Sequence, residues 1–98
     1  MKAYRTHNCS ELSIKNLNED VILSGWLDTK RDHGNLLFID LRDNYGITQC
    51  VIEVKHKLFD QINSLTNESV LKIIGKVIKR SNDTINKNLK TGDIEIEI

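Results

Sequence analysis

Two stretches in the middle of the chain alternate hydrophobic and polar residues with a period of two, the pattern of a strand buried on one face. They span residues 36–42 and 47–54 and are joined by a short turn at 43–46. Phe38 lies on the outer face of the first stretch, and Gln49 can lie near it if the two strands pair. An aromatic ring among polar side chains on the outside of a small sheet is a poor core residue and a good stacking platform. The inner face of the first stretch consists of Leu37, Ile39 and Leu41.

The segments on either side predict another strand and a helix. Residues 21–27 form the first strand, in which Gly25 suggests a bend or a β-bulge. The charged residues 29–35 then form an exposed hairpin end. Residues 55–66 place four apolar side chains at i, i+1, i+4 and i+7, which predicts an amphipathic helix of about three turns. That apolar stripe consists of Leu58, Phe59, Ile62 and Leu65.

Two more strands complete the predicted architecture. Residues 69–80 carry apolar side chains on both faces, so we expect this strand to be buried on much of both sides, and residues 93–98 alternate strictly. Three strands, a helix and two strands is the order of the OB-fold, an all-β, five-stranded Greek-key barrel with a helix between strands three and four. In that fold the helix closes one end of the barrel. The outer face of strands two and three, which here carries Phe38 and Gln49, binds oligonucleotides.

The composition is that of one soluble domain without a strong charge. Ninety-eight residues, of which 39% are hydrophobic and 29% charged, can bury a single modest core. Fourteen basic and fourteen acidic residues give a net charge of zero, which argues against gripping nucleic acid by bulk electrostatic attraction. No apolar run approaches the ~20 residues of a membrane span, and no signal peptide is visible, so we expect a cytoplasmic protein with no membrane partner. Cys9 and Cys50 are expected to be free thiols.

One stretch of the chain is basic. Residues 76–90 contain five basic side chains and one acidic one, Asp83. The stretch forms either a solvated face or a phosphate guide beside the platform. We favour Arg80 as a phosphate contact because a guanidinium can bind phosphate through two hydrogen bonds, and Lys76 is a second candidate. The basic residues are Lys76, Lys79, Arg80, Lys87 and Lys90.

No pattern in the chain is typical of catalysis or of metal binding. His7 and Cys9 are two metal-ligating residue types, but no second pair follows at zinc spacing. No glycine-rich phosphate loop with its lysine is present. We therefore expect no catalytic residue, no metal and no cofactor in this domain.

Three strings of residues resemble a known family. They are residues 31–34 (RDHG), 37–43 (LFIDLRD) and 46–49 (GITQ). Together they resemble the N-terminal anticodon-binding domain of bacterial-type aspartyl-tRNA synthetases (aspartate–tRNA ligases), and the resemblance covers nearly the whole chain. It implies that residues 1–98 are a single OB-fold domain from a longer synthetase whose separate catalytic domain is absent. The fragment itself would not be an enzyme. Its parent would be a ligase that uses ATP and Mg and forms a homodimer, while the isolated domain would be a monomer.

The resemblance also implies roles for individual residues. The phenylalanine matching Phe38 stacks on the middle anticodon base, a uracil, and the glutamine matching Gln49 hydrogen-bonds the same base. The arginine matching Arg31 contacts the anticodon loop. Stacking on an aromatic ring is worth ~1–3 kcal/mol and tolerates any base, whereas a side-chain amide adds a preference for uracil. The pattern of alternating residues had already singled out two of these three positions.

His33 bears on which tRNA is recognised. In the family, a histidine at this position is similar to what is seen in enzymes that charge the asparagine tRNA as well as the aspartate tRNA. Those enzymes also tend to carry a glycine in the loop after the fourth strand, and here that loop, Ser81-Asn82-Asp83-Thr84, contains none. The implied partners are therefore tRNA(Asp) and, more weakly, tRNA(Asn).

Other interpretations of the same residues stay open at this point. Phe38 would be a structural residue if the N-terminal segment covered it, Gln49 could be ordinary strand surface, and Arg31 could be a solvated charge. A sequence-tolerant single-strand-binding OB protein and an OB-type protein-interaction module are the alternative functions.

Overall fold

The computed structural model describes residues 5–80, 85–87, 89 and 91–98. The order of elements along the chain confirms the prediction of three strands, a helix and two strands. The elements are the 3₁₀ helix η1 (Ile14–Asn16) and strands β1 (Asp20–His33), β2 (Leu36–Arg42) and β3 (Ile47–Glu53), followed by helix α1 (Phe59–Asn63) and strands β4 (Val70–Lys79) and β5 (Ile94–Glu97).

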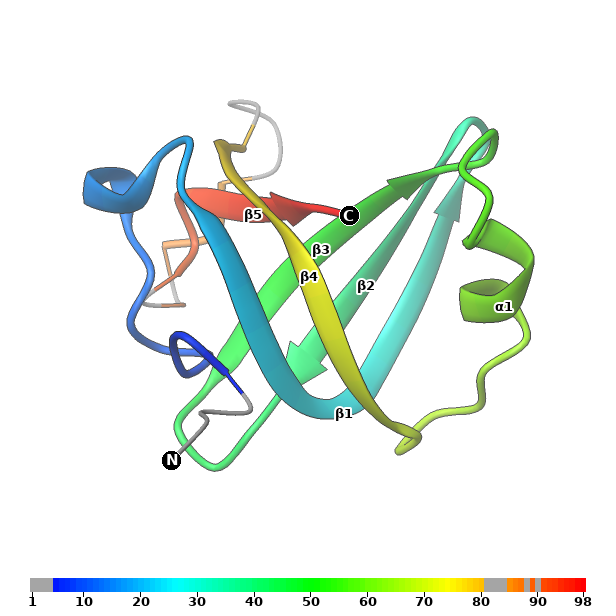
Figure 1. Ribbon diagram of the computed structural model, residues 1–98, viewed down its shortest axis with the longest axis horizontal. Helices are drawn as coiled ribbons and strands as arrows, with labels where there is room; N and C mark the ends of the chain where they lie inside the picture. The colour runs from blue at the N-terminus through cyan, green and yellow to red at the C-terminus, as the bar shows by residue number, and fades with distance from the viewer. Residues whose placement is uncertain (1–4, 81–84, 88, 90) are drawn as a thin grey trace.

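The five strands close into a barrel in the order β1-β2-β3-β5-β4 (Figure 1). All neighbouring strands are antiparallel except β3 and β5, which run parallel and bring Cys50 opposite Ile96. A ring of strands has no open edge, so the backbone groups within it pair with neighbouring strands. The predicted OB-fold is thus confirmed.

Strand β1 is twice as long as predicted and contacts two different neighbours. Its first part, as far as Trp26, pairs with β4, and its second part, from Trp26 onward, pairs with β2. The strand bends sharply between these parts (Figure 1). A Cβ atom at Gly25 would collide with the backbone carbonyl of Arg42 on β2, which explains the glycine. The register shifts between Leu27 and Thr29, so a bulge lies just beyond the glycine where we expected one.

The predicted hairpin end at residues 29–35 is wrong, because most of it is strand. The chain turns only at Gly34 and Asn35, where Gly34 has the positive φ of 72° that favours glycine. The charged residues before this turn stay in the strand because their side chains find partners across the sheet, as described below.

The inside of the barrel is filled by the alternating apolar residues of the strands. On β2 the buried residues are Leu37, Ile39 and Leu41, as predicted. On β4 the prediction of burial on both faces is wrong: Ile73 and Val77 face inward and are buried, whereas Val70 and Ile74 are 86% and 62% exposed. The full core is Cys9, Leu12, Val21, Leu23, Leu27, Leu37, Ile39, Leu41, Cys50, Ile52, Ile62, Ile73, Val77, Ile94 and Ile96.

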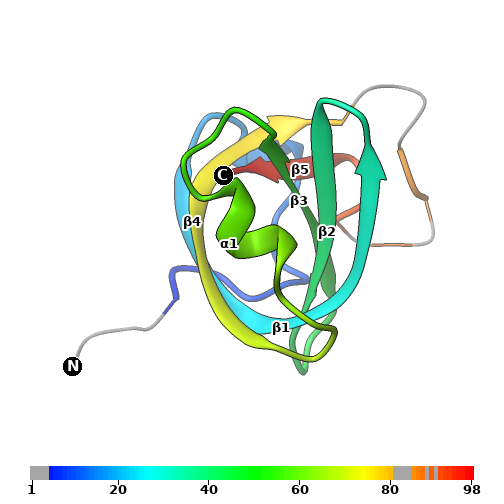
Figure 2. The same ribbon diagram turned by 90° about the vertical axis from the view of Figure 1, so that its right-hand side faces the viewer.

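Helix α1 lies across one end of the barrel, as predicted, but it is much shorter than three turns (Figure 2). Ile62 is buried, and Phe59 and Leu65 pack against the core. The helix begins without a side-chain cap at Leu58. At its end, the ammonium group of Lys30 donates to the carbonyl oxygens of Asn63 (2.7 Å) and Leu65 (2.6 Å). The apolar stripe therefore has the predicted function, and Lys30 satisfies carbonyl groups at the end of the helix.

Candidate nucleic-acid interface

Five of the six predicted site residues line one pocket on the outside of the barrel. The pocket has a volume of about 300 Å³ and receives side chains from β1, β2, β3 and the chain just after β4. We call it the platform pocket. Its lining residues are Arg31, His33, Phe38, Gln49, Arg80 and Asn86.

The strand register explains why these residues share one surface. Arg31 on β1, Phe38 on β2 and Val51 on β3 are direct cross-strand neighbours. Asp40 on β2 is likewise the direct neighbour of Gln49 on β3. Because directly opposed residues point to the same face of a sheet, both rows project outward.

Phe38 is half-buried and is flanked by a second ring. The imidazole of His33 meets it edge to face, with ring centroids 5.1 Å apart and planes at 84°. His33 itself is exposed. The phenyl ring is therefore supported on one side and still lines an open pocket, which is the geometry that a stacking platform requires.

Arg31 is held in place by a set of hydrogen bonds with its neighbours. Its Nη1 donates to Asp40 Oδ2 (2.7 Å) and to Thr29 Oγ1 (3.1 Å). Its Nη2 donates to Asp40 Oδ1 (3.1 Å) and to Gln49 Oε1 (2.9 Å). The guanidinium therefore binds the carboxylate through both terminal nitrogens and also contacts the amide that we predicted as the base reader. It is not the solvated charge that we considered as an alternative.

Gln49 lies on the outer face, as predicted, but it is not ordinary strand surface. Only 5% of the residue is exposed. While its Oε1 accepts from Arg31, its Nε2 donates to Glu95 Oε1 on β5 at 2.8 Å. Arg31, Gln49 and Glu95 thus form a chain of hydrogen bonds that crosses four strands with Asp40 at one end.

The two carboxyl groups of this chain have opposite pKa shifts. Burial raises the pKa of Asp40, but the hydrogen bonds from Arg31 and Thr29 outweigh burial, and the net shift is downward. Burial also raises the pKa of Glu95, and here the hydrogen bond from Gln49 and the charge of Arg80 offset it only in part, so the net shift is upward. The difference arises because Asp40 has a direct guanidinium partner and Glu95 does not.

Arg80 lines the platform pocket and is only 4% exposed. Its Nε donates to the carbonyl oxygen of Ile94 at 2.8 Å. Burial lowers the pKa of the guanidinium, against the opposing charges of Glu95 and Asp40. The alternative of a solvated face is therefore wrong for this residue, and its predicted contact with phosphate stays a prediction.

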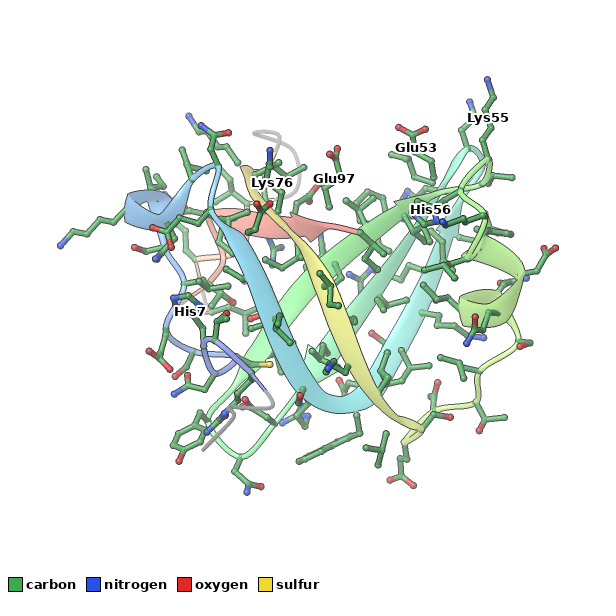
Figure 3. All side chains as sticks on the ribbon, in the orientation of Figure 1. His7, Glu53, Lys55, His56, Lys76 and Glu97 are labelled. Carbon is green, nitrogen blue, oxygen red and sulfur yellow. The ribbon has the colours of Figure 1, made fainter. Side chains whose placement is uncertain are left out.

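Lys76 is the one predicted residue that lies away from the platform pocket. It is exposed on β4, where Asp20 and Glu97 are its cross-strand neighbours (Figure 3). A lysine between two acidic residues adds little net positive potential to the surface. The predicted loop at 81–84 and Lys90, the last residue of the basic stretch, lie outside the described residues.

Sequence reasoning missed three residues that build this site. Asp40 alternates with Phe38 along the same strand, and this alternation is a usable signal that the two side chains share the outer face. Glu95 lies in the strictly alternating last strand, where every second residue is acidic, but only the parallel pairing of β3 and β5 brings it to Gln49. Asn86 belongs to a polar loop with no pattern to distinguish it.

A second hollow continues along the same outer face beyond the platform pocket. It has a volume of about 410 Å³ and adjoins the segment that follows β3 (Figure 3). Three glutamates line it, with one lysine and one histidine, so its charge is unfavourable for a phosphate backbone. The larger hollow is thus a poorer candidate than the platform pocket. Its residues are Leu36, Val51, Glu53, Lys55, His56, Ile78, Glu95, Glu97 and Ile98.

The described residues offer little for covalent or metal chemistry. Cys9 and Cys50 are both free and fully buried, and burial, with the charge of Asp43, raises the pKa of the Cys9 thiol to about 12. No group of three or more His, Cys, Asp or Glu side chains within the described ranges could hold a metal ion. In the same part of the chain, no helix is long and apolar enough to cross a membrane.

The fold and the platform pocket together match a known family. The family model of the OB-fold nucleic acid binding domain, of the tRNA anticodon type, matches residues 21–98. The chain belongs to this family. The match includes every predicted site residue, so the platform pocket lies within the nucleic-acid-binding unit.

Individual relatives confirm the resemblance to aspartyl-tRNA synthetases. The chain is 57% identical over its whole length to the aspartate–tRNA(Asp/Asn) ligase of Pelagibacter ubique, and 51% identical to that of Paramagnetospirillum magneticum. It spans only 16% and 11% of those proteins. Among solved structures, asparaginyl-tRNA synthetase from Pyrococcus horikoshii matches with a TM-score of 0.76 at 26% identity, over 93% of this chain and 20% of that one. This chain is therefore a member of the anticodon-type OB-fold family and is similar, over its whole length, to a short part of aspartate–tRNA ligases.

Proposed function

We propose that this domain recognises the anticodon loop of tRNA(Asp) for a parent enzyme that attaches aspartate to tRNA. The observation that carries the proposal is the platform pocket, where a half-exposed phenylalanine, a hydrogen-bonded amide and two arginines meet on the outer face of an OB barrel. A single-stranded loop can present its bases to such a pocket without the protein carrying a large positive charge.

In this proposal the middle anticodon base, uracil, stacks on Phe38 and is read by Gln49. The ring supplies stacking that any base can use, and the amide supplies a donor and an acceptor for the edge of the base. Arg31 supports the amide and, as a lining residue of the pocket, contacts the loop. Arg80 adds positive potential beneath the pocket, and Lys76 has at most a long-range effect.

We further propose that the domain also accepts tRNA(Asn). The observation that favours this is the position of His33, whose ring borders Phe38 at the open side of the platform pocket. A histidine there can contact a base next to the one stacked on the phenylalanine. The relatives from Pelagibacter ubique and Paramagnetospirillum magneticum are aspartate–tRNA(Asp/Asn) ligases, which supports the same inference.

The remaining properties concern the full-length protein. The relatives are six to nine times longer than this chain, and we propose that the additional part carries a catalytic domain that uses ATP and Mg. We also propose that the parent enzyme is a cytoplasmic homodimer and that this domain alone is a monomer.

The test is a titration of the protein with three anticodon stem-loops, in which binding is detected by NMR and by fluorescence anisotropy. The loops carry GUC (aspartate), GUU (asparagine) and GAC, in which the middle base is replaced. We expect GUC to shift the resonances of Phe38, Gln49 and His33, and GAC to bind more weakly. In Phe38→Ala, binding of GUC should weaken by ~1–3 kcal/mol because the stacking surface is lost. Val70→Ala, which changes an exposed side chain on β4, is the matched control and should bind normally.

Each outcome distinguishes among the candidate functions. Equal binding of GUC and GAC would identify a sequence-tolerant single-strand binder. No binding of any loop by a folded protein would leave a protein-interaction module. Equal binding of GUC and GUU, with GAC rejected, would support the acceptance of tRNA(Asn).

A further inference from the structure

The orientation of the Gln49 amide is set by its two neighbours. Oε1 faces Nη2 of Arg31 at 2.9 Å, and Nε2 faces Oε1 of Glu95 at 2.8 Å. A guanidinium can only donate hydrogen bonds, and an ionised carboxylate can only accept them. Reversing the amide would turn its NH₂ toward the guanidinium and its oxygen toward the carboxylate, so both bonds would be lost and replaced by repulsion. The amide therefore has one favourable orientation.

Both neighbours are themselves held in place. The four N–H groups on the terminal nitrogens of Arg31 are all used, by Asp40 twice, by Thr29 and by Gln49. Glu95 is only 8% exposed and lies on β5, which is paired on both sides within the barrel. Neither partner can swing away to follow the amide if it reverses.

Amide orientation decides which pyrimidine can be read. Uracil presents an N3–H donor next to a carbonyl acceptor, whereas cytosine presents an N3 acceptor next to an amino donor. Gln49 keeps one further lone pair on Oε1 and one further hydrogen on Nε2 for such a base. An amide that is free to reverse can pair with either pyrimidine held at the same place on the platform. An amide fixed in one orientation can pair with only one of them.

We propose that Glu95 is a positioning residue that, together with Arg31, fixes the Gln49 amide and so makes the platform pocket select uracil over cytosine. This inference rests on the proposed anticodon recognition. It assigns the choice between the two pyrimidines to a carboxylate on the last strand and not to the glutamine alone.

The experiment compares binding of a GUC stem-loop with that of a GCC stem-loop, which differs only in the middle base. The proteins are the wild type, Glu95→Gln and the control Glu97→Gln. Both substitutions remove one carboxylate from β5, but Glu97 is exposed, and no hydrogen bond joins it to Gln49. Glutamine at position 95 can accept or donate, so it lets the amide of Gln49 reverse.

We expect the wild type and Glu97→Gln to prefer GUC by tenfold or more, on the order of one specific hydrogen-bonded pair. In Glu95→Gln the preference should fall by about tenfold, mainly because GCC binds more tightly. A loss of affinity that is equal for both loops would overturn the proposal, since it would mean a direct contact or a general defect. An unchanged preference in a folded Glu95→Gln variant would overturn it as well.

A second measurement needs no substitution. In the free wild-type protein, one of the two side-chain NH₂ hydrogens of Gln49 should be protected from solvent exchange by its hydrogen bond to Glu95. Rapid solvent exchange of both hydrogens would mean that the amide is not held, and the inference would fail. If the wild type binds no stem-loop at all, it is the proposed anticodon recognition that fails, and the amide resonances still report on the orientation by themselves.

Discussion

The two parts of strand β1 carry opposite kinds of outer surface. Where β1 pairs with β4, the outer face carries two apolar pairs, Ile22 opposite Ile74 and Trp26 opposite Val70, and the β4 members of both pairs are largely exposed. Where it pairs with β2, the outer side chains are mainly polar and are hydrogen-bonded across the sheet, with Arg31 bound to Asp40 and Gln49. Gln49, which has two hydrogen-bond partners, is 5% exposed, whereas Val70 and Ile74 are 86% and 62% exposed, so burial on the outside of this barrel follows the availability of partners more than polarity.

This contrast explains why the platform pocket, and not the more apolar surface, is the candidate interface. Exposed aliphatic side chains are common on soluble proteins and need no partner. A buried polar group is costly unless it is hydrogen-bonded, so a set of buried polar side chains that satisfy one another specifies a geometry. The polar part of β1 has that property, and the apolar part does not.

The largest expected effect is on the core that both surfaces share. Ile39 is fully buried on β2 beneath the platform pocket. Ile39→Ala should lower the free energy of unfolding by about 2–5 kcal/mol, because it removes buried methyl groups and leaves a cavity. Urea denaturation followed by tryptophan fluorescence measures the change. Ile39→Val should cost about 0.5–1.5 kcal/mol, and equal losses for the two variants would contradict this account of the core.

The next effect separates the covered polar surface from an ordinary surface ion pair. Asp40→Asn should lower the free energy of unfolding by about 1–2 kcal/mol, because Arg31 loses its two-point partner, while solvent screens part of the loss. The folded state lowers the pKa of Asp40, so its contribution is present above the ordinary carboxyl pKa of about 4 and is lost as the pH falls through the lower folded value. Denaturation curves from pH 2 to 7 should show the difference between wild type and variant shrinking in acid.

The matched control is Asp28→Asn. Asp28 forms a single contact of 3.1 Å with Arg42, and both side chains are about a third or more exposed. This change should cost no more than about 1 kcal/mol. If both aspartates proved equally important, the contrast between covered and open polar groups would be refuted.

A third prediction concerns the cost of burying Glu95. Burial raises its folded pKa, with partial compensation from Gln49, so the folded state holds the proton more tightly than the unfolded state does. The stabilising contribution of the protonated form is present below the ordinary pKa and is lost as the pH rises through the folded pKa. Glu95→Gln avoids this loss. The melting temperature of the variant minus that of the wild type should therefore be larger at pH 8 than at pH 4. Calorimetry at both pH values checks the sign, and a gain that shrinks with rising pH would contradict it.

The smallest effect should come from the apolar surface. Ile74→Thr keeps a β-branched side chain in β4 and changes a residue that is 62% exposed. We expect the free energy of unfolding to change by no more than about 0.5 kcal/mol, and binding of the GUC stem-loop to stay the same. A clear loss of RNA binding would show that the interface extends onto this surface.

Much of the platform pocket could be predicted because its central residues lie on two adjacent strands. The period-two alternation placed Phe38 and Gln49 on the outer face, and a two-strand register then brings them close. The partner of Gln49 could not be predicted in the same way. Glu95 is 46 residues further along the chain, and its contact depends on β5 pairing parallel to β3. Lys76 lies away from the platform pocket for the related reason that proximity in sequence to Arg80 does not place it on the same surface.

By itself, the sequence determined the number and order of the elements, the face on which each strand residue lies and the family to which the chain belongs. Those properties depend on local periodicity and on short strings of residues. Only the tertiary structure decided that Gln49 and Arg80 are buried, that Arg31 binds Asp40, and that β1 continues to His33. Local periodicity reports the direction in which a side chain points. Its burial and its hydrogen-bond partners depend on which side chains of other strands lie beside it once the barrel is closed.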